Sequence, residues 1–314
     1  MEPKKCKISK GTKLVELADL FELKPEELRR YHNTYCPLSD LIEEDIPSHV
    51  RIIFIPPDNQ TKSIFFNPET KKIKYDTENK LSRINYSKRF GVMQKYYHNE
   101  KLTLQIHYEI EITLQNNIVY LNRGQVYVDQ QSIDYTYEQV ADKIGSFIYP
   151  LKLKVGDSGE IEGVLNLDEI AKRWHTQRSK LADYYVGKEV EVIFNKTDRL
   201  FRNAQKLKEG LKKSWFYKLY FLPMYAKLND DKEITLELPI HSKGLIKYYK
   251  PILKIDESIS KTHLFAINVK GENIDFLYKL DAKDNSIFSI QGQIDSLEDD
   301  NKKIIFECYS LLSN

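Results

Sequence analysis

Glycine and cysteine are scarce in this sequence of 314 residues. The 12 glycines do not cluster, so the sequence lacks the glycine-rich loop that cradles a phosphate group. The three cysteines are an odd number without metal-ligand spacing, which argues against a disulfide framework and against a zinc site of the common pattern. Reduced thiols in the cytoplasm are the simplest interpretation.

Long apolar runs and catalytic motifs are missing as well. No stretch approaches the ~18 uncharged apolar residues of a membrane-spanning helix, and no apolar export segment follows the basic start MEPKKCKISKGTK. We therefore expect a cytoplasmic location without a transmembrane segment, with association with a cell-envelope machine left open. Because neither a Ser-His-Asp order nor a His-Glu-x-x-His motif occurs, we predict no enzymatic activity, no metal and no cofactor.

Tyrosine and charged residues are abundant instead. Apolar residues make up 41% and charged residues 30%, as in a globular protein, and 21 tyrosines supply aromatic area for cores and contact surfaces. The net charge is only +2, and the basic surplus lies in the middle of the sequence. A charge so close to neutral argues against nucleic acid as the partner.

The first sixty residues predict the order strand, helix, helix, strand. Cys6–Ser9 alternates like a strand, Gly11 breaks it, and Thr12 is a suitable cap for a helix that begins at Lys13 or Leu14. Within this helix four apolar residues share one face. They are Leu14, Leu17, Ala18 and Phe21.

A proline marks the start of the second helix. Pro25 suits the first helical position, Leu28 and Tyr31 form the buried face, and Asn33 is expected to end the helix. The run from Val50 to Ile55 then predicts a strand that stops at Pro56.

These residues together resemble a LysM domain over residues 6–56. The resemblance is carried by Gly11-Thr12, by Leu-x-x-Leu-Ala-x-x-Phe from Leu14, by Pro-Glu-Glu-Leu from Pro25, by Asn33 and by Phe54-Ile55-Pro56. It implies a βααβ fold and, in many members, binding of glycans that contain N-acetylglucosamine, such as peptidoglycan. The implied groove lies between two loops, whose residues here are Gly11, Thr12, Lys13 and Leu14 on one side and Ile46, Pro47 and Ser48 on the other.

Two features depart from the family pattern. The usual Gly-Asp-Thr is here Gly11-Thr12-Lys13, so the aspartate is missing. The connection over residues 34–49 is long and contains Leu38, Leu41 and Ile42, whose side chains could pack across the groove.

The middle of the sequence predicts an α+β domain. Residues 58–100 read as a connector with short hairpins around Ser63–Phe66 and Lys72–Tyr75. A long hairpin follows, since Leu102–Leu114 alternates strictly and Ile118–Val128 returns with a bulge at Gly124. The segment Ser132–Glu138 leads into a predicted helix that runs to about Ile144. The remaining predicted elements are a hairpin of 151–155 and 159–164, a helix over Leu167–Tyr185, a strand over Glu189–Phe194 and a helix from Thr197 to about Trp215.

Two groups of side chains in the middle region suggest binding. His107, Glu109 and Glu111 share one strand face and could hold a divalent ion, but a solvated sheet face carries the same residues and is the interpretation we adopt. A basic surface is predicted beside Trp215 and its aromatic neighbours, either as a contact for an anionic partner or as a solvated helix face. Its residues are Lys206, Lys208, Lys212 and Lys213.

From residue 233 onward the pattern predicts an antiparallel meander. Its strands are expected at Ile234–Leu238, Tyr249–Ile255, His263–Val269, Ile274–Leu280, Ser286–Ile294 and Lys303–Tyr309. The predicted fold class is therefore α+β, with a small βααβ domain before a larger antiparallel β-rich body that has two or three helices. The expected segments are 1–57, 58–100, 101–225 and 226–314.

Three functions are compatible with this organisation. The first is a non-enzymatic bacterial scaffold that docks to a protein partner or assembly through its N-terminal domain. The second is a protein that binds peptidoglycan-type glycans. The third is a carrier of an apolar ligand, or a chaperone- or immunity-type protein, which uses the β-rich body and would need a cavity there.

Overall fold

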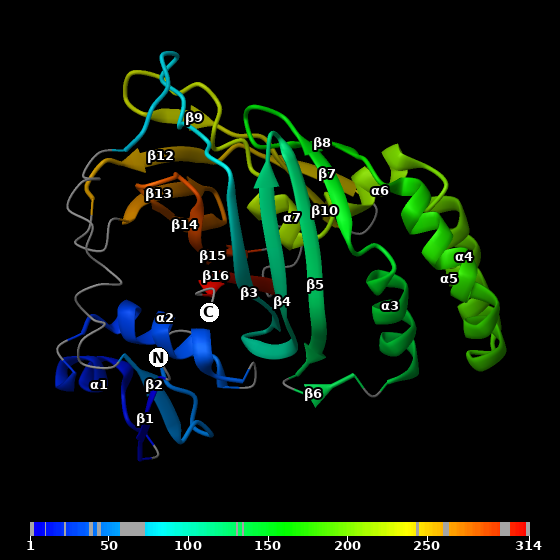
Figure 1. The fold of residues 1–314 in the computed structure, drawn as a ribbon, viewed down its shortest axis with the longest axis horizontal. Coiled ribbons are helices and arrows are strands. Elements are labelled where there is room, and N and C mark those ends of the chain that lie inside the picture. The colour runs from blue at the N-terminus through cyan, green and yellow to red at the C-terminus, as the bar shows by residue number, and fades with distance from the viewer. Residues whose placement is uncertain are drawn as a thin grey trace.

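The computed structural model describes most of the chain. The described residues are 3–9, 11–21, 23–37, 40–42, 45–56, 73–129, 131–133, 135–242, 245–259, 264–295 and 302–311. The fold is α+β and is dominated by one antiparallel sheet, as predicted (Figure 1). The predicted strand at Ser63–Phe66, the beginning of the one at Lys72–Tyr75, and Leu38 lie outside the described residues.

The main sheet has twelve strands among the described residues. Its strand order is β8-β7-β5-β4-β3-β16-β15-β14-β13-β12-β9, with β6 paired to β5 beside this path. In chain order the strands are β3 (Tyr86–His98), β4 (Lys101–Gln115), β5 (Ile118–Val128), β6 (Gln131–Ser132), β7 (Leu151–Val155), β8 (Ile161–Val164), β9 (Glu233–Thr235), β12 (Ile252–Asp256), β13 (Leu264–Gly271), β14 (Ile274–Asp281), β15 (Ile287–Asp295) and β16 (Lys302–Leu311). A separate hairpin consists of β10 (Leu238–Ser242) and β11 (Leu245–Tyr249).

The predicted meander and the predicted long hairpin are halves of the same sheet. Strands β12 to β16 follow one another antiparallel, and β4 pairs with β5 through a bulge opposite Glu109, at the predicted Gly124. The halves join where β16 pairs with β3 from Lys302↔His98 to Leu311↔Arg89. Strand β3 therefore contradicts the predicted connector over residues 58–100, because its polar side chains belong to a central strand.

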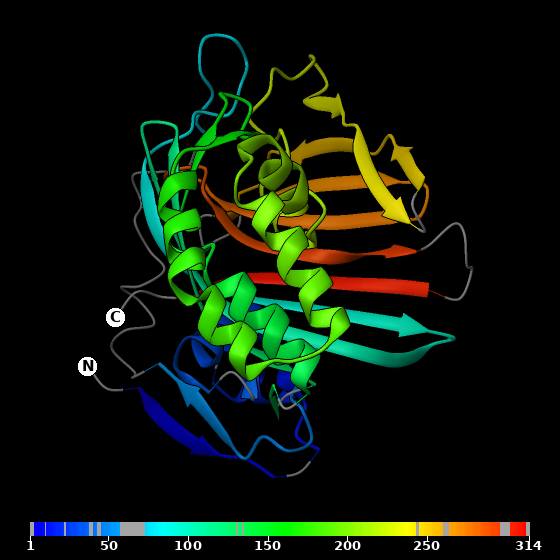
Figure 2. The same ribbon diagram turned by 90° about the vertical axis from the view of Figure 1, so that its right-hand side faces the viewer.

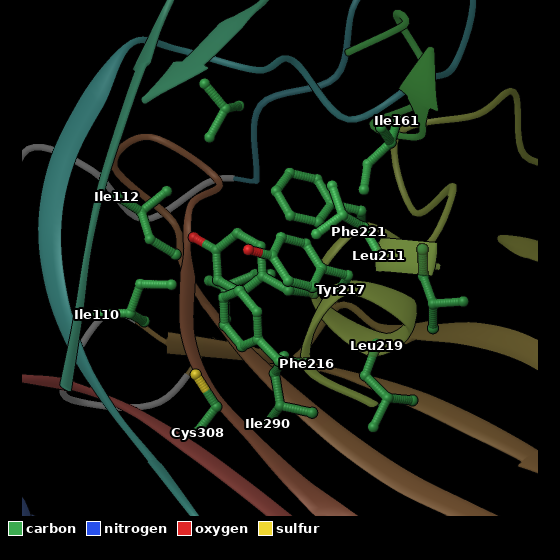
Figure 3. Packing of buried hydrophobic residues seen from close by; sticks show 14 of the residues in the cluster. Ile110, Ile112, Ile161, Leu211, Phe216, Tyr217, Leu219, Phe221, Ile290 and Cys308 are labelled. Atoms are coloured by element: carbon green, nitrogen blue, oxygen red, sulfur yellow. The ribbon is translucent and has the colours of Figure 1, made fainter. Parts of the chain in front are cut away.

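Helices cover one face of the sheet (Figure 2). In chain order they are α3 (Thr136–Ser146), α4 (Leu167–Tyr184), α5 (Lys188–Leu200), α6 (Ala204–Leu211) and α7 (Trp215–Tyr220). Their apolar residues pack with alternate residues of the strands, such as Ile110 and Ile112 of β4 and Cys308 of β16. Figure 3 shows the rings of Phe216, Tyr217 and Phe221 inside this core.

Two predicted elements in this region are wrong. Residues 189–194 form part of helix α5 rather than a strand, and the helix predicted from Thr197 to Trp215 is divided among α5, α6 and α7. Val190 and Phe194 are four residues apart, as on one face of a helix, and both pack in the core.

The N-terminal residues form a unit with the predicted element order. It consists of β1 (Lys4–Lys7), α1 (Leu14–Leu20), α2 (Pro25–Tyr35) and β2 (Ile52–Ile55), and β1 pairs antiparallel with β2. Its own small core contains Leu14, Leu17, Ala18, Leu28, Ile42, Val50, Ile53 and Ile55.

Two details of this unit differ from the prediction. The cap of α1 is Lys13 rather than Thr12, whose hydroxyl donates to the Ser9 carbonyl at 2.9 Å. Asn33 does not end α2, which continues to Tyr35. The buried amide of Asn33 bonds instead to both backbone groups of Ile42, at 2.8 and 2.9 Å. Asn33 thereby fixes the long connection that precedes β2.

Helix α2 packs on the second face of the sheet. The guanidinium of Arg30 lies 4.1 Å from the ring centre of Phe288, Arg29 lies over Tyr309 at 5.1 Å, and Glu26 pairs with Lys279 at 3.1 Å. This packing helps to explain why the face of β4 predicted to be solvated is partly buried. The sheet is thus covered by helices α3–α7 on one side and by the N-terminal unit on the other (Figure 1).

Candidate functional site

The two loops predicted to flank a groove are joined directly. The Asp45 carboxylate accepts from the Leu14 backbone N–H at 2.7 Å and from the Ile46 N–H at 2.9 Å, and it pairs with the Lys13 ammonium at 2.8 Å. The hydrogen bonds and Lys13 lower the pKa of Asp45 against the opposing effect of burial. The carboxylate expected within Gly-Asp-Thr is absent, and one from the facing loop connects the two sides instead.

The residues of these loops differ in exposure. Gly11, Lys13 and Ser48 are exposed, Thr12, Ile46 and Pro47 are half-buried, and Leu14 is buried in the small core. Ile42 also packs in that core rather than across the two loops. The loop residues therefore lie together, and their role in binding stays a prediction.

The strand trio considered for a metal ion is engaged otherwise. His107 is only 1% exposed and stacks on Tyr127 with ring centres 5.0 Å apart, while Glu111 pairs with Arg89 at 3.0 Å. Burial lowers the pKa of His107. Within the described ranges no three His, Cys, Asp or Glu side chains converge as a metal site.

A cavity of about 540 Å³ lies between the sheet and the helices. One wall comes from β3, β4 and β5, and the other from the helices and the segment after α3. Its lining residues are Gln94, Tyr96, Ile106, Tyr108, Arg123, Gly145, Ile148, Tyr149, Leu200, Leu207, Gly210, Leu211, Lys213, Ser214, Trp215 and Tyr217. The volume is in the range of sites for small molecules.

The walls of this cavity are mainly apolar and aromatic. Strand alternation turns Tyr96, Ile106 and Tyr108 toward the helices, and the spacing of Leu207 and Leu211 places both on one side of α6. The short helix α7 supplies Trp215 and Tyr217. Such walls suit the apolar part of a ligand.

Polar groups occupy a few defined places in these walls. The Arg123 guanidinium donates to the Asp142 carboxylate at 2.6 Å, and the hydroxyls of Tyr149 and Tyr217 share a hydrogen bond of 2.7 Å. Burial raises the pKa of both tyrosines, so the two hydroxyls remain protonated at neutral pH. The Arg123 guanidinium and the two neutral hydroxyls therefore lie within a mainly apolar wall.

The predicted basic surface meets this cavity at one residue. Lys213 lines it, while Lys206 and Lys212 are exposed nearby on α6 and at its end. Lys208 points to β8, where its ammonium donates to the Glu162 carbonyl at 3.3 Å. Lys208 therefore faces β8, and the binding role of the four lysines stays a prediction.

A second cavity of about 250 Å³ separates α2 from the sheet. Charged side chains from both sides line it, including the paired Glu26 and Lys279 and the stacked Arg29 and Arg30. Because these groups already contact one another or neighbouring rings, we interpret this space as a gap in an interface.

Sequence reasoning missed the larger cavity for a simple reason. Its walls come from strands and helices far apart in the sequence, and β3 was taken for a connector. The one local signal was the basic and aromatic run that contains Lys213, Trp215 and Tyr217.

Comparisons with known proteins identify no family. No protein-family profile matches the sequence, and no curated protein matches it. Among solved structures, one on lipid–protein interactions in lipovitellin aligns with 73% of this chain and 25% of its own, at 12% identity and a TM-score of 0.37. A likeness this low carries no argument about fold or function. No helix in the described part is long and apolar enough to cross a membrane.

Proposed function

We propose that this chain is a non-enzymatic binding protein that holds a small, largely apolar molecule between its sheet and helices. The supporting observation is the cavity of about 540 Å³, since a body that served only as a scaffold would be expected to fill this space. This is the carrier function considered from the sequence, and the cavity is the observation that supports it.

Binding of an uncharged fluorophore tests this proposal. N-phenyl-1-naphthylamine should bind saturably, with a rise in its emission and a change in that of Trp215, which lines the cavity. Trp174 is completely buried in the helical core and provides a constant background. In Trp215→Phe the change in tryptophan emission on binding should disappear, while the rise in fluorophore emission should remain.

A cavity-filling variant identifies where the probe binds. Ile106→Trp should reduce the affinity at least ~10-fold by occupying the space. Leu165→Trp is the matched control, because Leu165 is exposed and does not line the cavity. Equal affinities of the two variants, or no saturable binding by the original chain, would refute the proposal.

Docking through the N-terminal unit is a second candidate function. Helix α1 exposes Val15 (57%) and Leu20 (72%) beside the acidic Glu16 and Asp19, while α2 attaches the unit to the sheet. An apolar patch with a basic rim on a protein partner would complement this surface. The LysM resemblance and the βααβ order support a recognition role for the unit.

Site-specific crosslinking in the native cell tests the docking candidate. A photoreactive residue at position 20 should give one discrete product, which Val15→Glu removes, whereas position 165 should give none. Products of equal yield at both positions would contradict docking.

Glycan binding through the same unit is tested separately. N-acetylglucosamine oligomers would have to shift the amide signals of Lys13 and Ser48, because both lie in the paired loops. Unchanged signals at saturating oligomer would contradict glycan binding.

A further inference from the structure

We propose that the molecule held in the sheet–helix cavity is an anionic amphiphile with a single carboxylate head, which is bound beside Arg123. The inference rests on the proposed function and adds the charge and class of the ligand. The chain of the ligand would lie along the aromatic wall that includes Tyr96 and Trp215.

The charge of the lining residues favours an anion. Arg123 and Lys213 are the charged members among the described lining residues, and both are basic. Asp142 partly neutralises Arg123 from α3 but does not itself line the cavity. A carboxylate that enters an apolar wall gains from a fixed cation there, because the local dielectric constant is low.

The guanidinium of Arg123 has donor capacity to spare. Its side chain is mostly buried, lies over the rings of Tyr108 and Tyr149 at 6.0 and 5.3 Å, and donates to one carboxylate oxygen. Its Nε–H is buried and has no partner within the described residues. One carboxylate does not saturate a guanidinium, which can bind a second one side by side with the first.

A glycine leaves room beside this guanidinium. A Cβ added to Gly145 on α3 would lie 3.4 Å from both terminal nitrogens of Arg123. Any side chain at this position would therefore occupy the approach to the charge. Glycine at this position adds no side chain over the guanidinium, so the charge can be approached from the cavity that both residues line.

Exposed lysines would assist the entry of an anion. Lys213 lines the cavity. Lys206 on α6 and Lys212 at the end of α6 are exposed nearby. Positive charges close to a binding site raise the local concentration of an anionic ligand. The amphiphile would thus meet basic residues outside and a buried arginine inside.

Three probes with the same chain and different heads test the inference. Decanoate, decanol and decyltrimethylammonium are titrated below their aggregation limits, with Trp215 emission and displacement of the neutral fluorophore as readouts. Decanoate should bind at least ~10-fold more tightly than decanol, and the cation most weakly.

Variants of the head-group site separate the charge from the fold. Arg123→Gln should reduce decanoate affinity at least ~10-fold more than decanol affinity. Asp142→Asn, which removes the competing carboxylate, should tighten decanoate binding. Gly145→Ala should weaken decanoate and not decanol, and it favours the helix, so a folded protein is expected even if Arg123→Gln does not fold.

The outcomes distinguish the two proposals. If neither the fluorophore nor any decyl probe binds, the proposed function is wrong. If decanol and decanoate bind equally well, or if Gly145→Ala affects them equally, the cavity holds a ligand without an anionic head and the present inference alone is overturned.

Discussion

His32 connects three parts of the N-terminal unit through its imidazole ring. The Phe54 backbone N–H donates to Nδ1 at 3.1 Å, so Nε2 carries the proton and donates to the Asp40 carbonyl at 2.9 Å. The ring is completely buried, and burial lowers the pKa of His32 despite the contact with Asp40. Only the neutral ring can accept the Phe54 hydrogen bond, so protonation would break the link between α2 and β2.

The N-terminal unit should therefore lose stability in mild acid. Because the pKa of His32 is lower in the folded state, the unfolded chain binds the proton first as the pH falls below about 6.5. The free energy of unfolding should fall between pH 7 and pH 5, with faster amide exchange in β2. In His32→Gln this dependence should be weaker. An unchanged dependence in the variant would contradict this role.

Lys218 should make stability depend on pH in the alkaline range. Its ammonium lies 4.4 Å from the ring centre of Trp215, and burial lowers the pKa of Lys218 to about 8. Between about pH 8 and the ordinary lysine pKa the unfolded state binds more protons, so stability contributed by this residue rises with pH. Lys218→Met should be more stable than the original at pH 7, by at most about 3 kcal/mol.

Denaturant unfolding at several pH values measures this difference. The gap between Lys218→Met and the original chain should narrow from pH 7 to pH 9.5. Since the many buried tyrosines are common to both proteins, their titration cancels in the comparison. A gap that does not depend on pH would mean that Lys218 is already neutral or well solvated at pH 7.

At the level of elements, alternation of apolar and polar residues predicted strands most accurately where a clear turn sequence followed. Asn116 and Asn117 both have positive φ, as the tight turn between β4 and β5 requires, and the predicted hairpin is present. The pattern failed in β3, where Gln94 lines the cavity and the neighbouring Met93 and Lys95 serve the other face. Strand β3 is buried without interruption only from Phe90 to Gln94, and the polar Gln94 and Lys95 break what would otherwise be the apolar run of a strand covered on both faces.

Strand β15 depends on the absence of one side chain. A Cβ at Gly292 would lie 2.1 Å from the Asp275 carbonyl oxygen and 2.5 Å from the Phe276 ring on β14. Gly292→Ala should therefore separate β14 from β15 and lower the free energy of unfolding by about 2 kcal/mol or more. Gly163→Ala on β8 is the control, because it has open space, and should change stability little. Denaturant midpoints measure both, and equal midpoints would contradict the close packing.

At the level of the whole molecule, the sequence did not reveal that the N-terminal unit covers the sheet. Its element order followed from local signals, but the contacts of Arg29 and Arg30 with Tyr309 and Phe288 join residues at opposite ends of the chain. The cavity has the same origin, since its walls are brought together only when the sheet is complete. Sequence patterns specify which side chains leave one face of an element, but not which distant element they meet.

The attachment of the unit should depend on Arg30. Its guanidinium stacks on Phe288, and its stem is mostly buried between α2 and the sheet. Arg30→Ala should cost about 2 kcal/mol through lost packing and the lost cation–π contact. Amide exchange should increase in β16 as well as in α2. Arg51→Ala, whose side chain bonds within its own loop, should leave β16 protected; faster exchange in both variants would contradict this assignment.

The pairing of β16 with β3 also governs how the protein can be made. Strand β3 (residues 86–98) pairs with β16 (residues 302–311). About two hundred intervening residues must therefore be synthesised before β16 can take its place between β3 and β15. Until then each half presents an open edge to any neighbouring chain. Synthesis that stops short of residue 302 should therefore yield aggregates rather than a smaller soluble domain, and a chaperone that shields β3 would raise the yield of native protein.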